Sequence, residues 1–122
     1  MTGLDERADG ERGRVRITGV TAMQLKGANG QSLVRVDTDS GLYGIGEAGV
    51  RGTICRANLG WLGPKVLLGA DPLNIDKLYH EMMGLQHTYQ AHVPTVSGID
   101  IALWDLAGKI LNVSVSELLT GR

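Results

Sequence analysis

Residues 95–121 constrain the fold more than any other part of the sequence. Apolar side chains recur there at spacings of three, four and seven residues, which is the periodicity of an α-helix. They are Val96, Ile99, Leu103, Leu106, Ala107, Ile110 and Leu111. On a helical wheel the apolar positions cover an arc roughly twice as wide as the ~100° stripe of an ordinary surface helix. We therefore expect a helix that other elements cover on more than one side.

Local signals mark the two ends of this helix. Pro94 suits a first helical turn, because its φ is fixed and it has no N–H to leave unpaired. Asn112 is of a residue type that ends helices in the left-handed conformation. Ser114 and Glu117 have the spacing of a capping box, which predicts a second, short helix directly afterwards.

Five residues of the long helix break its apolar character. Gly98 and Gly108 lie on the narrow opposite face, where they would let another backbone come close. Asp105 and Lys109 form a polar pair one turn apart, worth a few tenths of a kcal/mol. Asp100 falls inside the apolar arc, and a buried carboxylate is costly unless it is paired or hydrogen-bonded. It is either a structural carboxylate tied to an arginine or to free amides, or a site residue.

The first half of the chain predicts a small sheet. Its strands are expected at residues 15–25, 31–37 and 42–47. An irregularity is expected at Gly19 in the first of them. Turn residues at 26–30 and at 39–41 join consecutive strands over short distances, which indicates an antiparallel meander.

Helices follow the strands. A helix over 54–62 is interrupted by Gly63 and Pro64 and resumes over 65–68. A second helix is expected to begin at Asp71, as N-cap, with Pro72 in its first position. Strands followed by helices predict an α+β fold, a three-stranded antiparallel meander followed by a bundle of three to four helices.

Composition limits the classes of protein. The length of 122 residues is that of one domain, and a net charge of −1 gives no electrostatic case for binding nucleic acid or an anionic membrane. A single cysteine cannot form an internal disulfide, which suits a cytoplasmic protein. No apolar run is long enough for a membrane span, and the N-terminus lacks the apolar stretch of a signal peptide. Residues 1–14 are expected to be disordered, and residues 15–122 to form the domain.

Few patterns suggest chemistry. Residues 44–49 match G-x-G-x-x-G, but the glycines lie within a hairpin strand and Glu47 would place negative charge beside a pyrophosphate, so we reject a dinucleotide site. His87 and His92 either face a cleft or are ordinary solvated or hydrogen-bonded side chains. Cys55, near Arg51, is either a reactive thiol or a packing residue. The sequence thus offers no catalytic residues and no metal ligands.

Several stretches together resemble a known family. They are DSGLYGIGEA at 39–48, LGADP at 68–72, SGIDIALWDLAGK at 97–109 and VSELL at 115–119. Over about residues 15–122 the chain resembles the N-terminal domain of the mandelate racemase and muconate lactonizing branch of the enolase superfamily. The resemblance implies an α+β domain that caps a (β/α) barrel.

The resemblance also implies where function lies. In the family the barrel holds Mg²⁺ and the bases that remove a proton α to a substrate carboxylate, and the capping domain supplies two loops that close over the substrate. By position these loops correspond to residues 26–30 and 48–53. The residues implied in them are Lys26, Ala28, Asn29, Gly30, Val50, Arg51 and Gly52. For each, an ordinary surface role is the alternative.

Two functions follow from this resemblance. The first is the capping domain of a Mg²⁺-dependent acid-sugar dehydratase or racemase, whose partner is the barrel and which reaches a carboxylate sugar acid only with it. The chain alone is then expected to bind no Mg²⁺ and to be inactive. The second is a non-enzymatic module that binds a ligand or further copies of itself. Apolar surface left uncovered would favour self-association.

Overall fold

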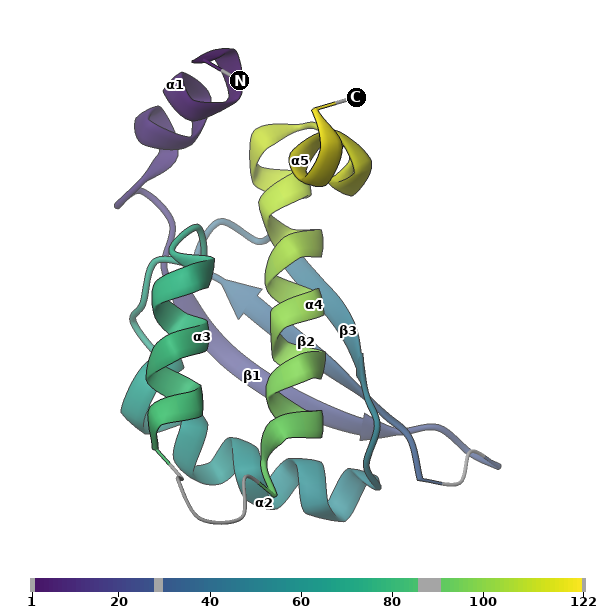
Figure 1. The fold of residues 1–122 in the computed structure, drawn as a ribbon. Coiled ribbons are helices and arrows are strands. Elements are labelled where there is room, and N and C mark those ends of the chain that lie inside the picture. Colours follow the sequence, from purple (N-terminus) through teal and green to yellow (C-terminus); the bar gives the residue numbers. More distant parts are fainter. Residues whose placement is uncertain (1, 28–29, 86–90, 122) are drawn as a thin grey trace.

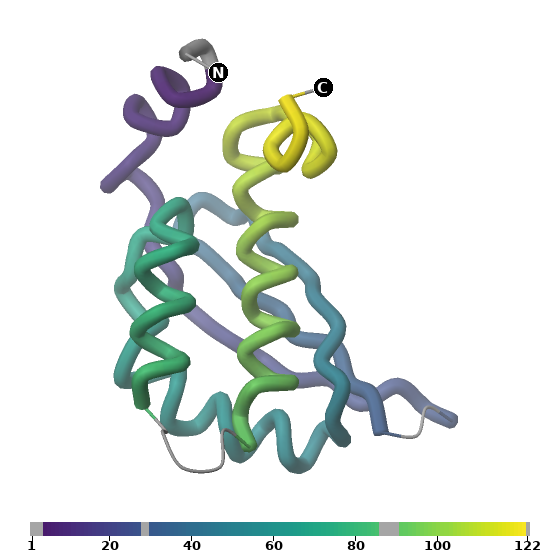
Figure 2. The backbone as a smooth tube through the Cα atoms, viewed as in Figure 1, coloured from purple at the N-terminus to yellow at the C-terminus, as the bar shows by residue number. Residues whose placement is uncertain are grey.

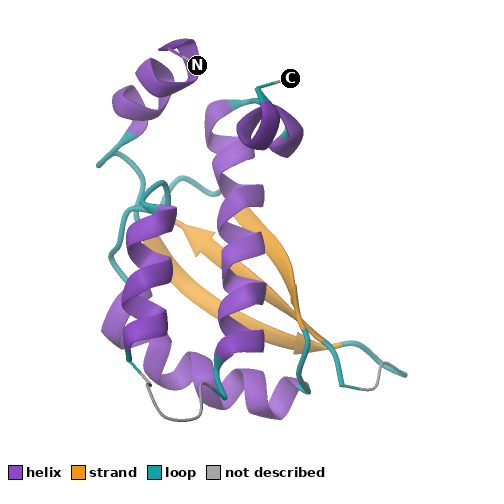
Figure 3. Cartoon of the chain, in the orientation of Figure 1, coloured by secondary structure: helices purple, strands orange, loops and turns teal. Residues whose placement is uncertain are grey.

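The computed structural model describes residues 2–27, 30–85 and 91–121. In chain order its elements are α1 (Thr2–Glu11), β1 (Ile17–Gln24), β2 (Ser32–Thr38), β3 (Tyr43–Ala48), α2 (Gly52–Leu62), the π-helical turn η1 (Gly63–Leu67), α3 (Ile75–Gly84), α4 (Val93–Leu111) and α5 (Val115–Thr120). Helices α3 and α4 lie in front of the sheet, whereas α1 and α5 lie beyond its end, next to the end of α4 (Figure 1). The predicted α+β class, a meander followed by helices, is confirmed (Figure 3).

The sheet is an antiparallel meander with the strand order β1-β2-β3. The register between β1 and β2 shifts between Ile17 and Gly19, which is the irregularity that the sequence predicted. Val34 and Val36 are fully buried because alternate residues of the central strand face the helices. A dinucleotide site at residues 44–49 would need a parallel strand, but β3 pairs antiparallel with β2, which agrees with the rejection of such a site.

Helix α4 is the centre of the core. It lies along β3 and also contacts β2, α2 and α3, so it is covered on more than one side as its wide apolar arc predicted. Its buried positions include Val96, Ile99, Ala102, Leu103 and Leu106. The core of this domain is therefore organised around one helix, as the sequence indicated.

Glycines bring β3 and α4 into backbone contact. A Cβ placed on Gly46 would overlap the carbonyl oxygen of Gly98, and one on Gly44 would overlap that of Ala102. A Cβ on Gly98 would lie 2.9 Å from the Cβ of Ala48. The expectation that Gly98 permits a close backbone approach is thus confirmed, and the glycines of β3 serve the same contact from the other side.

The predicted ends of α4 and the start of α5 are confirmed. Pro94 lies in the first turn of α4, and Asn112 ends the helix with a left-handed φ of 55°. The backbone N–H of Glu117 donates to Oγ of Ser114 (3.1 Å), which starts α5.

The predicted start of the helix at Asp71 is wrong. Helix α3 begins at Ile75, with Asn74 as the residue before it. The carboxylate of Asp71 instead accepts hydrogen bonds from the backbone N–H groups of Leu73 (2.9 Å) and Gly13 (2.8 Å). A contact with the distant N-terminal segment therefore uses the side chain that would have capped the helix.

The expectation that residues 1–14 are disordered also differs from the structure. Residues Thr2–Glu11 form α1, which lies beside the C-terminal end of α4 (Figure 2). The guanidinium of Arg7 donates to the carbonyl oxygen of Leu111 (2.6 Å), and that of Arg12 donates to Oδ1 of Asn74 (3.0 Å). These partners lie far along the chain, so local composition could not reveal them.

Candidate functional site

Two loops leave the sheet at the same edge. Gln24, Ser32 and Ala48 occupy one row of the sheet, because Gln24 pairs with Ser32 and Ser32 pairs with Ala48. The connection from β1 to β2 and the connection from β3 to α2 therefore start side by side. We call this the loop edge, and its two connections the first loop (residues 25–31) and the second loop (residues 49–52), which ends on the first residue of α2.

A single side chain joins the two loops. The backbone N–H of Gly52 donates to Oε1 of Gln24 (2.6 Å) at the end of the second loop. Nε2 of Gln24 donates to the carbonyl oxygen of Gln31 (2.8 Å) at the end of the first loop and to that of Leu25 (3.4 Å). The sequence analysis missed Gln24, because nothing in its local pattern distinguishes it from any exposed strand residue.

The predicted residues of the first loop are only partly described. Lys26 is exposed in a turn, and Gly27 and Gly30 adopt left-handed φ values of 82° and 72°. Such values favour glycine, which accounts for the two glycines in this short segment. Ala28 and Asn29 lie outside the described residues.

The predicted residues of the second loop differ in their exposure to solvent. Arg51 is exposed and extended, immediately before α2. Val50 is half-buried and packs against the core. Gly52 is buried, and a Cβ on it would lie 2.8 Å from the Cβ of Gln24. Among the predicted residues, Lys26 and Arg51 therefore present positive charge to solvent, whereas Val50 and Gly52 support the loop.

The other described titratable candidates, His92 and Cys55, are buried in the core. His92 is fully buried, with Nε2 2.9 Å from the carbonyl oxygen of Met82 and its ring against Trp61 at 5.4 Å between centroids. Nε2 faces an acceptor and so carries the proton. Cys55 is also fully buried, which supports the packing interpretation. His87 lies outside the described residues.

Asp100 is a half-buried carboxylate on α4. Burial raises its pKa, a hydrogen bond with Trp104 lowers it, and the nearby carboxylate of Asp76 on α3 raises it. The partner is thus an indole N–H, neither the arginine nor the free amides that the sequence analysis considered. These surroundings disfavour the ionised form of Asp100, and its contacts are with Trp104 of α4 and Asp76 of α3, neither of which belongs to the two loops.

Known proteins similar to this chain belong to one family. Residues 12–120 match the family described as the mandelate racemase / muconate lactonizing enzyme, N-terminal domain. The chain belongs to this family. The D-xylonate dehydratase of Haloferax volcanii is 38% identical over 118 residues, which are 91% of this chain and 28% of that protein. The D-galactarolactone cycloisomerase of Agrobacterium fabrum is 35% identical over 97 residues, 74% of this chain and 24% of that protein.

Solved structures of the mandelate racemase and muconate lactonizing family share the fold. An enolase of the mandelate racemase subgroup from Agrobacterium tumefaciens aligns with a TM-score of 0.79 and 31% identity, over 87% of this chain and 30% of that one. The chain thus spans 24% to 30% of the length of these relatives. In the part of the chain that the structure describes, no helix is long and apolar enough to cross a membrane.

Membership of the enolase superfamily implies Mg²⁺ in the full-length enzymes. Across residues 2–27, 30–85 and 91–121, no three His, Cys, Asp or Glu side chains gather in a way that would hold a metal ion. The described residues therefore offer no ligand set for Mg²⁺.

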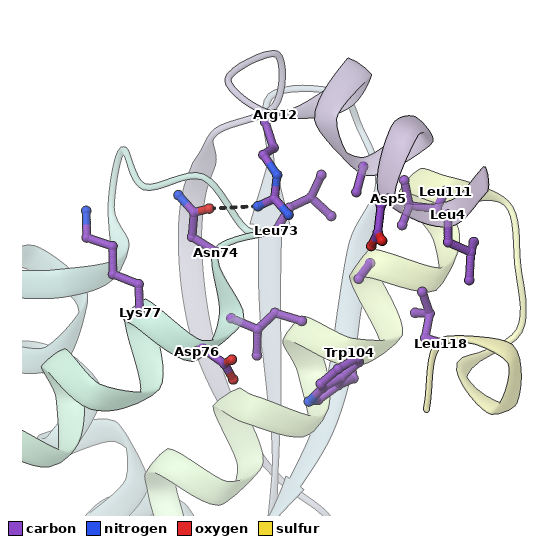
Figure 4. Close-up of a pocket in the computed structure, with 13 residues that line it drawn as sticks. Leu4, Asp5, Arg12, Leu73, Asn74, Asp76, Lys77, Trp104, Leu111 and Leu118 are labelled. Atoms are coloured by element: carbon purple, nitrogen blue, oxygen red, sulfur yellow. Dashed lines mark hydrogen bonds between the residues drawn. The ribbon is translucent and has the colours of Figure 1, made fainter. Parts of the chain in front are cut away.

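A separate pocket lies between α1, the start of α3, the C-terminal half of α4 and α5 (Figure 4). Figure 1 shows these parts at the opposite end of the domain from the loop edge. It has a volume of about 650 Å³ and is lined by residues of α1, α3, α4 and α5, together with Arg12 after α1 and Leu73 and Asn74 before α3. Its wall is apolar at Leu4, Leu73 and Trp104, and the hydrogen bond from Arg12 to Asn74 crosses its rim. The pocket brings together no nucleophile and base, so its residues favour packing over catalysis.

Proposed function

We propose that this chain is the capping domain of a Mg²⁺-dependent enzyme that removes the α-proton of a carboxylate sugar acid. The capping domain closes the substrate site with its two loops and contributes to the choice of substrate. A barrel domain supplies the metal and the groups that move protons. The reaction that follows proton removal is a dehydration, with racemisation as the second candidate.

The observation that carries this proposal is the loop edge. Two glycine-containing loops leave adjacent residues of the sheet, and each presents an exposed cation, Lys26 in one and Arg51 in the other. Cationic side chains bind carboxylates through charge-assisted hydrogen bonds. Loops placed on a rigid scaffold are also the usual carriers of recognition.

The names of the relatives support a sugar-acid substrate. One is named a D-xylonate dehydratase and another a D-galactarolactone cycloisomerase. Both substrates are sugar acids or derived from one. A dehydration is therefore the reaction that we assign to the whole enzyme.

The surface of α4 and α5 supports a partner. Ile101 is 50% exposed and Leu119 is 63% exposed, and both line a shallow pocket with Ile45, Trp104 and Val115. We expect the barrel domain to cover this apolar surface in the enzyme. In the isolated chain we expect further copies of the chain to cover it, which is also what a stand-alone oligomerising module would show. Light scattering that finds a clean monomer at high concentration would contradict the self-association.

A chimera of this chain with the barrel of a relative, which we call the joined protein, tests the capping role. The N-terminal domain of a related sugar-acid dehydratase is replaced by this chain, and dehydration is compared with that of the barrel alone. We expect the barrel alone to be at least about 100-fold less active, because an open site loses substrate positioning and admits water. We expect the joined protein to recover most of that loss.

Magnesium binding separates the roles of the two parts. Calorimetry should find a stoichiometric Mg²⁺ site in the joined protein and none in this chain alone. A joined protein that folds, binds Mg²⁺ and is no more active than the barrel alone would contradict the capping role. A stoichiometric site in the isolated chain would contradict the division of labour.

A further inference from the structure

We propose that Gln24 is a positioning residue that couples the two loops, so that they move as one unit. Its importance for substrate rests on the proposed capping function, but the coupling itself is a property of this chain. Gln24 donates to the carbonyl oxygen of Gln31 at the end of the first loop and accepts from the backbone N–H of Gly52 at the end of the second. Among the described residues, no other side chain makes hydrogen bonds to both loops.

The contact with the second loop replaces a missing helix cap. Arg51 precedes α2 and makes no side-chain capping hydrogen bond. The first N–H groups of a helix have no partner within the helix and need an acceptor from elsewhere. Oε1 of Gln24 supplies that acceptor to Gly52, the first residue of α2.

The contact is close because Gly52 has no side chain. A side chain at this position would lie 2.8 Å from the Cβ of Gln24 and 3.1 Å from its Oε1. Gly52 is therefore the residue that lets the start of α2 approach the end of β1. The short distance fixes the second loop against Gln24 more tightly than a bond between two mobile side chains would.

The chemistry of the amide suits a bridge between two loops. A glutamine side chain carries an acceptor oxygen and a donor nitrogen at the same end. Oε1 accepts from the backbone of the second loop while Nε2 donates to the backbone of the first. A carboxylate could keep the first contact but not the second, and an apolar side chain could keep neither.

Three variants of the full 122-residue chain separate these contacts. Gln24→Met, with a side chain of similar length, removes the hydrogen bonds with Gly52 and Gln31. Gln24→Glu keeps the acceptor for Gly52 and loses the donor for Gln31. Gln31→Met is the matched control, since Gln31 is an exposed neighbour whose backbone, and not its side chain, makes the contact with Gln24.

The first measurement is amide hydrogen exchange of Gly52 by NMR. One hydrogen bond contributes about 1 kcal/mol net, so its loss should speed exchange about fivefold. We expect that acceleration in Gln24→Met, and the wild-type rate in Gln24→Glu and in Gln31→Met. Retention of the wild-type rate in Gln24→Met would overturn the assignment of Gln24 as the cap of α2.

The second measurement reads the coupling, which a purely stabilising side chain would not affect. Arg51→Gly loosens the second loop, and the amide shifts of Gly30 and Gln31 report the first loop. We expect Arg51→Gly to move those shifts in the wild-type and Gln31→Met backgrounds. In the Gln24→Met and Gln24→Glu backgrounds we expect the response to fall at least about fivefold.

Equal responses in all four backgrounds would overturn the coupling. Gln24→Glu keeps the contact with α2, so it remains informative if Gln24→Met does not fold. The experiment uses neither a barrel nor a substrate. A failure of the coupling therefore leaves the capping function standing, and an inactive joined protein leaves the coupling standing.

Discussion

The contact between β3 and α4 and the loop edge are built in opposite ways. At the first, the two backbones come so close that side chains added at Gly44 and Gly46 would overlap carbonyl oxygens, and one added at Gly98 would meet Ala48. At the second, the backbones are separate, and the side chain of Gln24 connects them. The first region depends on the absence of side chains and the second on the presence of one.

This difference suits the proposed division, in which the β3–α4 contact serves stability and the loop edge serves recognition. A close-packed interface transmits strain and tolerates little change in volume. Loops held by a few hydrogen bonds open at low cost in free energy, which suits elements that admit and enclose a substrate. Substitutions in the two regions should therefore differ in what they change.

The largest effect is expected at the packed interface. Gly46→Ala places a Cβ against the carbonyl oxygen of Gly98, so we expect a loss of at least about 3 kcal/mol in the free energy of unfolding. Gly60→Ala in α2 is the matched control, because a Cβ there meets nothing within 4 Å. It should stabilise the chain by up to about 1 kcal/mol. Urea denaturation measures both, and equal effects would contradict the close approach.

A smaller effect is expected for the carboxylate that joins the same two elements. Oδ2 of Asp105 accepts from the backbone N–H of Ile45 (2.9 Å) and lies 3.1 Å from Nζ of Lys109. Asp105→Ala should cost about 1–2 kcal/mol, because it leaves a strand N–H without its acceptor. Asp37→Ala, which breaks only the pair with Arg35, should cost less than about 1 kcal/mol. Thermal unfolding that ranks the two in the reverse order would count against this comparison.

The smallest effect is expected at Asp100, and it depends on pH. Burial raises the pKa of this carboxyl, so the folded state binds its proton more tightly than the unfolded state. The free energy of unfolding then falls as pH rises from the ordinary aspartate pKa to the raised one. Asp100→Asn keeps an acceptor for Trp104 and removes the charge. It should be slightly more stable than wild type at neutral pH and equal to it at low pH, and a difference that does not change with pH would contradict the assignment.

Local signals predicted the elements that depend on local chemistry. The spacing of apolar residues predicted α4, and Asn112 predicted its end. Ser114 predicted the start of α5, and Gly19 predicted the irregularity in β1. The resemblance pointed to the two loops, and the structure places their ends side by side at one edge of the sheet.

The features that the sequence did not reveal all depend on contacts between distant residues. Asp71 was expected to cap a helix but binds the backbone of Gly13, which is 58 residues away. Helix α1 is held through Arg7 and Leu111, which are 104 residues apart. Gln24 meets Gly52 across 28 residues, and no local pattern indicates that pairing.

The selectivity of the joined enzyme tests the central claim most directly. Lys26→Ala and Arg51→Ala are introduced singly, and kcat/KM for the sugar acid is measured beside the free energy of unfolding. Loss of one charge-assisted hydrogen bond costs about 1.5–3 kcal/mol, so kcat/KM should fall by about 10- to 100-fold in at least one variant. The free energy of unfolding should change by less than about 0.5 kcal/mol. Unchanged kcat/KM in both variants of a folded, active enzyme would contradict the claim that the loop edge recognises the substrate.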